Sequence, residues 1–192
     1  MTGRTHDLIG FTALTAFVLY QPLQEMSLAT GIVAFSANFA GALSPDLDEP
    51  TASAWKKIRG GSTFGKLLAP ILGSHRMISH SLLGTLLVGY LLKLLLEAMS
   101  GVLLVDMTIV WWAFMIGYIS HLISDAVTKE GIPLFFPIPI NIGIPPFSSL
   151  RIKSGGLIEK SIIFPGFIIF EGYLIYANYE KVLEFFTEYV KR

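Results

Sequence analysis

The chain has 192 residues, of which 53% are hydrophobic and only 15% are charged, and its formal net charge is zero. A soluble domain is nearer a quarter charged, so this composition indicates an integral membrane protein. The balanced charge offers no basic surface for nucleic acid. Because the chain has no cysteine, disulfides and thiolate ligands are excluded, and any metal must be bound by histidines and carboxylates.

Apolar runs of the length needed to cross a hydrocarbon core divide the chain into about five predicted spans. The second run is rich in Gly, Ala and Ser, which let helix backbones approach closely. We therefore expect an all-α fold, a polytopic transmembrane helix bundle that forms one domain over residues 1–192. Counts of four or six spans stay open. The five predicted spans are approximately residues 8–22, 28–44, 80–99, 102–124 and 161–178.

Basic residues cluster in the connections on one side of this predicted bundle. Two connections carry them, one after the second span and one after the fourth, whereas the opposite connections carry none. By the positive-inside rule, the basic side faces the cytoplasm across an inner membrane. The residues concerned are Lys56, Lys57, Arg59, Lys66 and Arg76, then Lys129, Arg151, Lys153 and Lys160.

Three further segments are predicted to have structures other than membrane spans. Residues 55–72 interleave basic and apolar side chains, which predicts an interfacial amphipathic helix on an anionic leaflet. Residues 180–192 predict a short amphipathic helix at the interface. Residues 131–156 are rich in Pro and Gly, so they cannot form a helix, yet they are too apolar for a solvated loop. We expect a re-entrant or interfacial loop that caps the basic face and is buried against protein.

Candidate metal ligands gather at the basic ends of the predicted spans. His121 and Asp125 are four apart, so on a helix they share one face and can bind one ion. Asp46 and Asp48 follow a proline where the second span ends, and an extended turn lets two such carboxylates converge. Taken alone, each residue is more often a helix cap, but seven groups from distant segments favour a metal site. They are His6, Asp46, Asp48, His75, His80, His121 and Asp125.

Two intramembrane acids lie at other levels. Asp106 opens the fourth predicted span and Glu171 lies within the fifth. We interpret both as structural or interfacial residues.

Three stretches resemble a known family: SPDLDEP, HRMISHSLLG and GYISHLISDAVTKEGIPLFFP. They are similar to the PD-[IL]-D, HRG-x-T-HS and H-x3-D-x2-T-x2-G-[IV]-P-L motifs of the YdjM-type membrane-bound, metal-dependent hydrolases, which also have an N-terminal His. The match runs from His6 to about Pro137. Met77 replaces the usual Gly and Ser79 the usual Thr. The resemblance implies a metal-dependent hydrolase.

A weaker similarity concerns His121 and Asp125 alone. They resemble the H-x3-D pair of zinc phospholipase C and P1-type nucleases, which would imply phosphoester hydrolysis.

These observations lead to the hypothesis of a membrane-embedded metal-dependent hydrolase. We expect one or two divalent ions, Zn first and Mn or Fe as alternatives, bound by the seven residues above. Asp48 is expected to act as general base and Arg76 to neutralise the phosphate. Arg151 and Lys153 are expected at the rim, with Arg151 anchored by Glu159. Because the site lies at the cytoplasmic headgroup level, membrane lipids or a phosphorylated, lipid-like small molecule are the expected partners and substrates.

Two other functions stay open. An ion or solute transporter predicts polar residues spread through the membrane midplane. A non-enzymatic membrane scaffold with a structural metal predicts a closed coordination sphere.

Overall fold

The computed structural model describes residues 1–20, 26–48, 55 and 77–190. Within these residues the protein is all-helical and contains no strand, which confirms the predicted class. The predicted amphipathic helix at residues 55–72 lies outside the described residues except for Trp55, whose indole donates to Leu47 O at 3.2 Å. The described α-helices are α1 (Gly3–Tyr20), α2 (Leu28–Leu43), α5 (Leu82–Met99), α6 (Met107–Ala126), α7 (Phe164–Ala177) and α8 (Tyr179–Val190).

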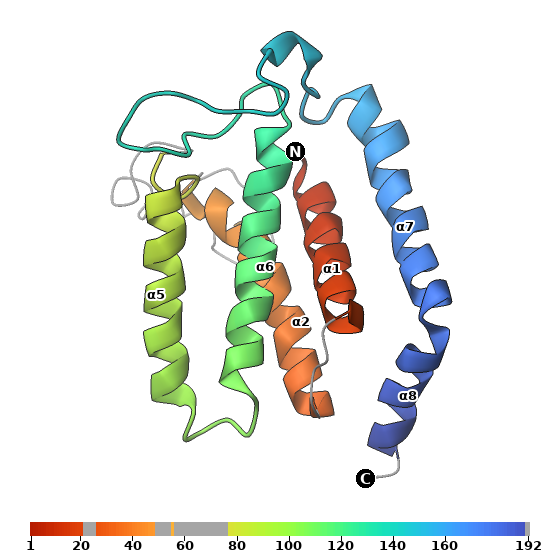
Figure 1. The fold of residues 1–192 in the computed structure, drawn as a ribbon. Coiled ribbons are helices and arrows are strands. Elements are labelled where there is room, and N and C mark those ends of the chain that lie inside the picture. The colour runs from red at the N-terminus through yellow and green to blue at the C-terminus, as the bar shows by residue number, and fades with distance from the viewer. Residues whose placement is uncertain (21–25, 49–54, 56–76, 191–192) are drawn as a thin grey trace.

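The helices form an antiparallel bundle built around α6 (Figure 1). Helix α6 packs against α2, α1 and α5, while α7 packs mainly against α1. The N-terminus and the long connection between α6 and α7 lie at one end of the bundle, and the C-terminus lies at the other. The 3-10 turn η1 (Ser44–Asp48) follows the last residue of α2, at the end of the bundle where the N-terminus of the chain lies. Residues from five segments are thereby brought to one end.

Small residues allow α2 and α6 to touch through their backbones. A Cβ on Gly41 would lie 2.1 Å from Phe114 O, and one on Gly117 would lie 2.2 Å from Asn38 O. The Asn38 side chain donates across the same contact to Ala113 O at 2.9 Å. The glycines therefore fix the distance between the two helices, as the composition of the second predicted span indicated.

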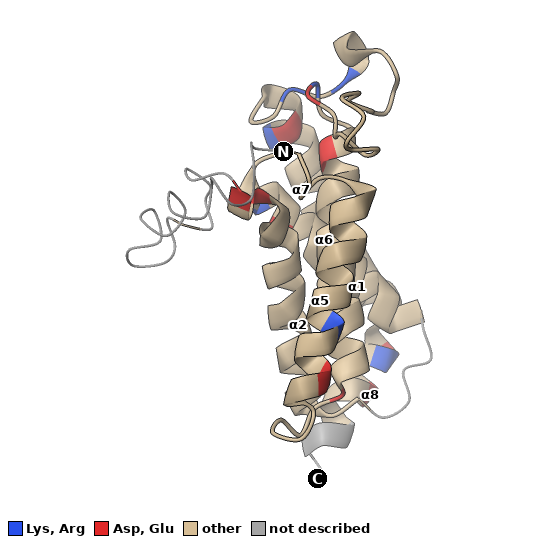
Figure 2. Cartoon of the chain, turned by 90° about the vertical axis from the view of Figure 1, so that its left-hand side faces the viewer, with Lys and Arg blue, Asp and Glu red and all other residues tan. Residues whose placement is uncertain are grey.

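Four of the described helical segments are long and apolar enough to cross a membrane: Leu28–Asp48, Leu82–Met99, Met107–Ala126 and Glu159–Ala177. Only 11% of Leu82–Met99 and of Glu159–Ala177 is buried inside the protein, so these two segments turn most of their surface outward, toward lipid. Charged side chains lie toward the two ends and leave an uncharged middle band on the face shown in Figure 2. With α1, these segments agree with about five spans.

Two helix boundaries differ from the sequence expectation. Helix α1 begins at Gly3, so His6 lies within the helix and not ahead of it. Helix α6 begins at Met107, where the Asp106 carboxylate accepts from Thr108 N at 2.8 Å and Ile109 N at 3.1 Å. Asp106 is thus a helix N-cap, which supports its structural interpretation.

The Pro- and Gly-rich connection after α6 folds into a fixed loop over the end of the bundle (Figure 1). Ile132 and Ile142 exchange two backbone hydrogen bonds of 2.8 Å, and Ile144 N donates to Ala126 O at 2.8 Å. Leu82 N donates to Leu134 O at 2.9 Å, which ties the loop to the start of α5. The connection contains no α-helix and lies at the end that carries the predicted ligands, as expected. The expected burial against protein is wrong, because large apolar side chains of the loop, such as Ile140 and Phe147, are 61% and 70% exposed.

Arg151 holds this loop together and does not pair with Glu159. Its guanidinium donates to Pro145 O and Pro146 O at 2.7 Å each. A Cβ on Gly143 would lie 2.3 Å from Arg151 Cζ, so the guanidinium packs directly on that glycine. The predicted pairing of Arg151 with Glu159 is therefore wrong, because the Arg151 guanidinium donates its hydrogen bonds to loop carbonyls instead.

Candidate metal centre

Five of the seven predicted ligands converge at the loop-covered end of the bundle. They come from α1, the turn after α2, the segment before α5, and two successive turns of α6. All except Asp46 are almost fully buried, and the Asp46 side chain is 23% exposed. The five residues are His6, Asp46, His80, His121 and Asp125.

The distances between their donor atoms suit a single ion. His121 Nε2 lies 3.5 Å from Asp46 Oδ1 and 3.9 Å from Asp125 Oδ2. His80 Nε2 lies 3.8 Å and 3.7 Å from the same two oxygens. Two triads, His6–Asp46–His121 and His80–His121–Asp125, have donor atoms that all lie within 4.8 Å of one another. Two ligands bound about 2 Å from one cation lie at most about 4 Å apart, so the pairs at 3.5 to 3.9 Å fit one ion.

His121 turns a lone pair toward the two carboxylates. Its Nδ1 lies 2.6 Å from the carbonyl oxygen of Ala42, which can only accept, so we assign the ring proton to Nδ1. In the neutral imidazole the Nε2 atom then has no proton, and it is buried without a hydrogen bond to any described residue. A histidine whose outer nitrogen is fixed by a carbonyl is the arrangement usual for a metal ligand.

His80 is oriented in the same way through a serine. The Ser79 hydroxyl donates to Asp48 Oδ2 at 2.5 Å and lies 3.0 Å from His80 Nδ1. Since the hydroxyl has a single proton, Nδ1 must donate to Ser79 Oγ, which leaves a lone pair on Nε2. Asp48 therefore reaches the centre through Ser79 and is not among the converging donor atoms.

His6 admits both tautomers. Ser124 Oγ lies 2.8 Å from His121 O, to which it can donate, and 2.7 Å from His6 Nδ1. When Ser124 donates to the carbonyl, His6 Nε2 carries a lone pair 3.2 Å from Asp125 Oδ1. In the other tautomer Nε2 donates to that carboxylate or to Met1 O at 3.1 Å. His6 can thus bind the ion or support Asp125.

The electrostatics of the cluster favour a cation at its middle. Two carboxylates face imidazole lone pairs, and groups that only accept repel one another when buried. His80 precedes the spanning segment Leu82–Met99, and its burial holds its pKa well below neutral, so protonation of His80 does not relieve the repulsion at neutral pH. The Met1 amino group contacts Asp125 Oδ1, so one cationic group already lies at the edge. One divalent ion would balance the two carboxylates.

Glu159 fixes the start of α1 and with it His6. Its carboxylate is buried and accepts from Thr2 N at 2.8 Å, Thr2 Oγ1 at 2.7 Å, Thr5 Oγ1 at 2.6 Å and Gly155 N at 2.7 Å. Sequence reasoning missed this role, as well as those of Ser124 and the Ala42 carbonyl. Ser79 carried a signal, because the family motif has a hydroxyl residue at that position.

Three predicted site residues remain: His75, Arg76 and Lys153. His75 and Arg76 lie outside the described residues. Lys153 is exposed on the loop.

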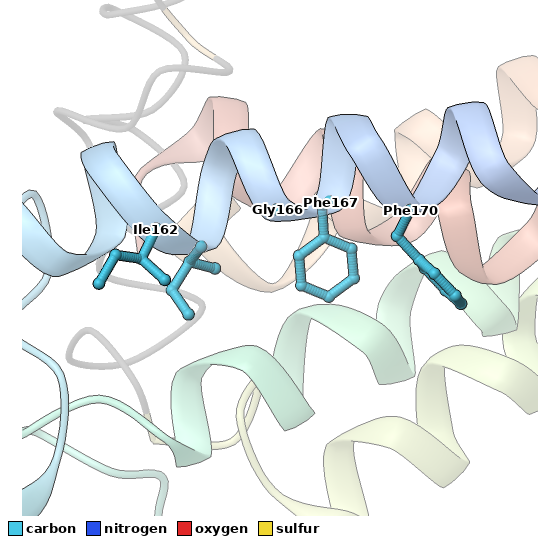
Figure 3. A pocket seen from close by; sticks show the side chains of 5 residues that line it. Ile162, Gly166, Phe167 and Phe170 are labelled. Carbon is cyan, nitrogen blue, oxygen red and sulfur yellow. The ribbon is translucent and has the colours of Figure 1, made fainter.

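An apolar hollow of about 300 Å³ lies along α7, lined by Ile162, Ile163, Gly166, Phe167 and Phe170. Figure 3 shows Phe167 and Phe170 projecting from one side of the helix. A Cβ on Gly166 would meet nothing within 4 Å, so the hollow is open there. None of the lining residues can titrate or bind a metal, so the hollow is suited to a hydrocarbon chain and is separate from the histidine cluster.

Comparisons with known proteins agree with an integral membrane protein. The family described as YdjM inner membrane protein matches residues 1–182 of the chain. An uncharacterized protein of Bacillus subtilis (strain 168), YvsG, is 29% identical over 163 residues, which cover 85% of this chain and 88% of that protein. No solved structure matches the chain significantly.

Proposed function

Because the chain belongs to the YdjM inner membrane protein family, we propose that it is a membrane-embedded, metal-dependent hydrolase whose centre is the cluster of His6, Asp46, His80, His121 and Asp125. The observation that carries the proposal is the approach of two histidine Nε2 atoms to the same two carboxylate oxygens, at 3.5 to 3.9 Å. A cation between buried acceptors arranged in this way would stabilise them. The ligand set has only nitrogen and oxygen donors, which suits Zn, Mn or Fe.

The chemistry proposed for the centre is hydrolysis of a phosphoester. A divalent ion supplies a Lewis acid and an acidified water at neutral pH. The chain's own groups position the ligands: Ala42 O and Ser79 hold the two imidazoles in the required tautomer. Asp46 is the most exposed ligand, so substrate would enter beside it. The geometry favours a positioning role for Asp48 over the predicted role of general base, because its carboxylate is engaged by Ser79.

The proposed substrate is a phosphorylated lipid or another amphipathic phosphoester. The centre lies at the end of apolar spanning helices, where headgroups are found. The hollow along α7 offers room for a hydrocarbon chain. The described basic residues at this end favour the cytoplasmic side by the positive-inside rule; they are Arg4, Lys129, Arg151, Lys153 and Lys160.

The test is metal analysis of the purified protein, followed by turnover of phosphorylated lipids in mixed micelles. We expect about one divalent ion per chain and phosphate release that stops on chelation and returns with Zn, Mn or Fe. Glu97→Gln is the matched control, since Glu97 is 60% exposed at the other end of α5. Unchanged phosphate release after complete removal of metal would refute the proposal. Stoichiometric metal without turnover of any phosphoester would instead favour a scaffold with a structural ion.

A second candidate, ion or solute transport, is favoured by one observation. Glu171 lies within the span Glu159–Ala177 and is 9% exposed, and no described residue hydrogen-bonds either carboxylate oxygen. Intramembrane acids of this kind often mark ion pathways. Transport predicts ion flux into proteoliposomes that Glu171→Gln abolishes, whereas hydrolysis predicts turnover that this change leaves within about twofold.

A further inference from the structure

The loop over the bundle carries a set of large apolar side chains that the protein leaves exposed. No charged residue occurs between Gly131 and Leu150. Six side chains in this stretch are each more than half exposed, from 53% to 70%. We call them the apolar crest: Phe135, Ile138, Ile140, Ile144, Phe147 and Leu150.

Hydrogen bonds fix the backbone of the loop that carries the exposed crest side chains. Ile132 and Ile142 bind each other through two hydrogen bonds, and Arg151 donates to two consecutive proline carbonyls. These contacts are made by the backbone and by Arg151, so the apolar side chains are not needed to hold the loop together. Large exposed apolar patches usually mark a surface that meets a membrane or another molecule.

The crest continues the outward-facing apolar surface of α5. Leu82 N donates to Leu134 O, which joins the loop to the first residue of the helix. Leu82, Leu83 and Leu86 are 49%, 51% and 64% exposed, and they lie in a segment apolar enough to span the membrane. Figure 1 shows the loop passing over the end of α5 and beyond it. The lipid chains that contact α5 would therefore also contact the crest.

Charge at the edges of the crest agrees with a lipid surface. Lys129, Glu130 and Lys153 flank the loop and are exposed, so the charge of these three residues is net positive. Exposed lysines beside an inserted apolar segment interact favourably with anionic headgroups. A second copy of the chain would offer the same lysines and no compensating acidic cluster on the loop itself.

We propose that the apolar crest inserts into the lipid leaflet on the metal-centre side, and that the centre takes its substrate from that leaflet. The loop is bonded directly to both flanks of the centre: Ile144 N donates to Ala126 O, next to Asp125, and Leu134 O accepts from Leu82, two residues after His80. An inserted crest holds these flanks at the depth of the headgroups. The second half of the inference rests on the proposed hydrolase function, whereas insertion itself does not.

The chain has no cysteine, so single cysteines can be introduced without background. Ile140→Cys and Phe147→Cys, each carrying a nitroxide, would be studied in vesicles of phosphatidylethanolamine and phosphatidylglycerol. Collisions with oxygen, which partitions into lipid, are compared with collisions with a water-soluble nickel chelate. Leu86→Cys serves as the membrane control and Lys153→Cys as the water control. Ile138→Cys and Leu150→Cys provide a second pair should either first variant fail to fold.

The crest labels are expected to resemble Leu86 in being reached by oxygen and protected from nickel by at least fivefold relative to Lys153. Nickel access equal to that of Lys153 would overturn insertion. Protection from both reagents would overturn it as well, because it would show a protein cover such as a second copy. Insertion in a protein that binds no metal would refute the hydrolase and leave the insertion standing. With metal bound and the crest inserted, turnover only of a soluble phosphoester would overturn uptake from the leaflet.

Discussion

His121 Nε2 lies 3.5 Å from Asp46 Oδ1, and both atoms are acceptors in the tautomer that the Ala42 carbonyl imposes. Asp46 lies in the middle of the turn after α2, and His121 belongs to α6. The contact therefore depends on how closely those two helices pack. A structural feature of the membrane bundle, the glycine contact between α2 and α6, thus sets the geometry of the candidate metal centre.

Changing Asp125 to Asn should remove most of the metal. The carboxylate faces His80 and His121 through one oxygen and His6 through the other, so the amide loses a negative charge at the centre. We expect at least a tenfold fall in metal affinity and loss of turnover, measured by metal analysis after dialysis against a weak chelator. Glu97→Gln removes an exposed carboxylate and should keep full occupancy. Full metal content in Asp125→Asn would show that this residue is not a ligand.

The two possible changes at Ser79 should have different effects. Ser79→Ala removes the hydroxyl between Asp48 and His80, so the imidazole loses the group that fixes its tautomer. Loss of such an outer partner typically costs about 10–100-fold in metal affinity. Ser79→Thr keeps the hydroxyl and should retain affinity within about threefold. If alanine and threonine behave alike, Ser79 has no role in orienting His80.

The sequence predicted the helices and five converging ligands because these depend on local patterns. Apolar runs define α2, α5 and α6, and the four-residue spacing places His121 and Asp125 on one face. The early start of α1 was not predictable in this way, since its polar first turn is stabilised by Glu159, more than 150 residues away. The Ala42 carbonyl is equally invisible to a motif because only packing brings it to His121.

Metal should stabilise the folded bundle. An ion that binds only the native centre raises the free energy of unfolding by about 2.7 kcal/mol when its concentration is 100 times its dissociation constant. Thermal unfolding in detergent should therefore shift to lower temperature on chelation and recover on addition of Zn, Mn or Fe. Asp125→Asn should show no such shift. A chelator effect of equal size in that variant would place the stabilising ion elsewhere.

Enlarging a glycine between α2 and α6 should damage both the fold and the metal centre. A Cβ at Gly41 would lie 2.1 Å from a backbone oxygen of α6, so the helices must separate. Overpacking of this kind costs about 1–3 kcal/mol or more. Gly41→Ala should lower both the midpoint of thermal unfolding and the metal content. Gly172→Ala is the matched control, because a Cβ there meets nothing within 4 Å and alanine favours the helix.

Two buried glutamates of the segment Glu159–Ala177 should respond differently to the same change. Glu159 accepts hydrogen bonds from Thr2, Thr5 and Gly155, and a hydrogen bond to a charged group contributes about 1.5–3 kcal/mol. Within the described part of the chain, Glu171 has no hydrogen bond to either oxygen. Glu159→Leu should therefore lower the midpoint of thermal unfolding by several degrees, whereas Glu171→Leu should leave it unchanged or raise it. A drop of equal size in both variants would show that Glu171 has a stabilising partner when the protein is in its membrane.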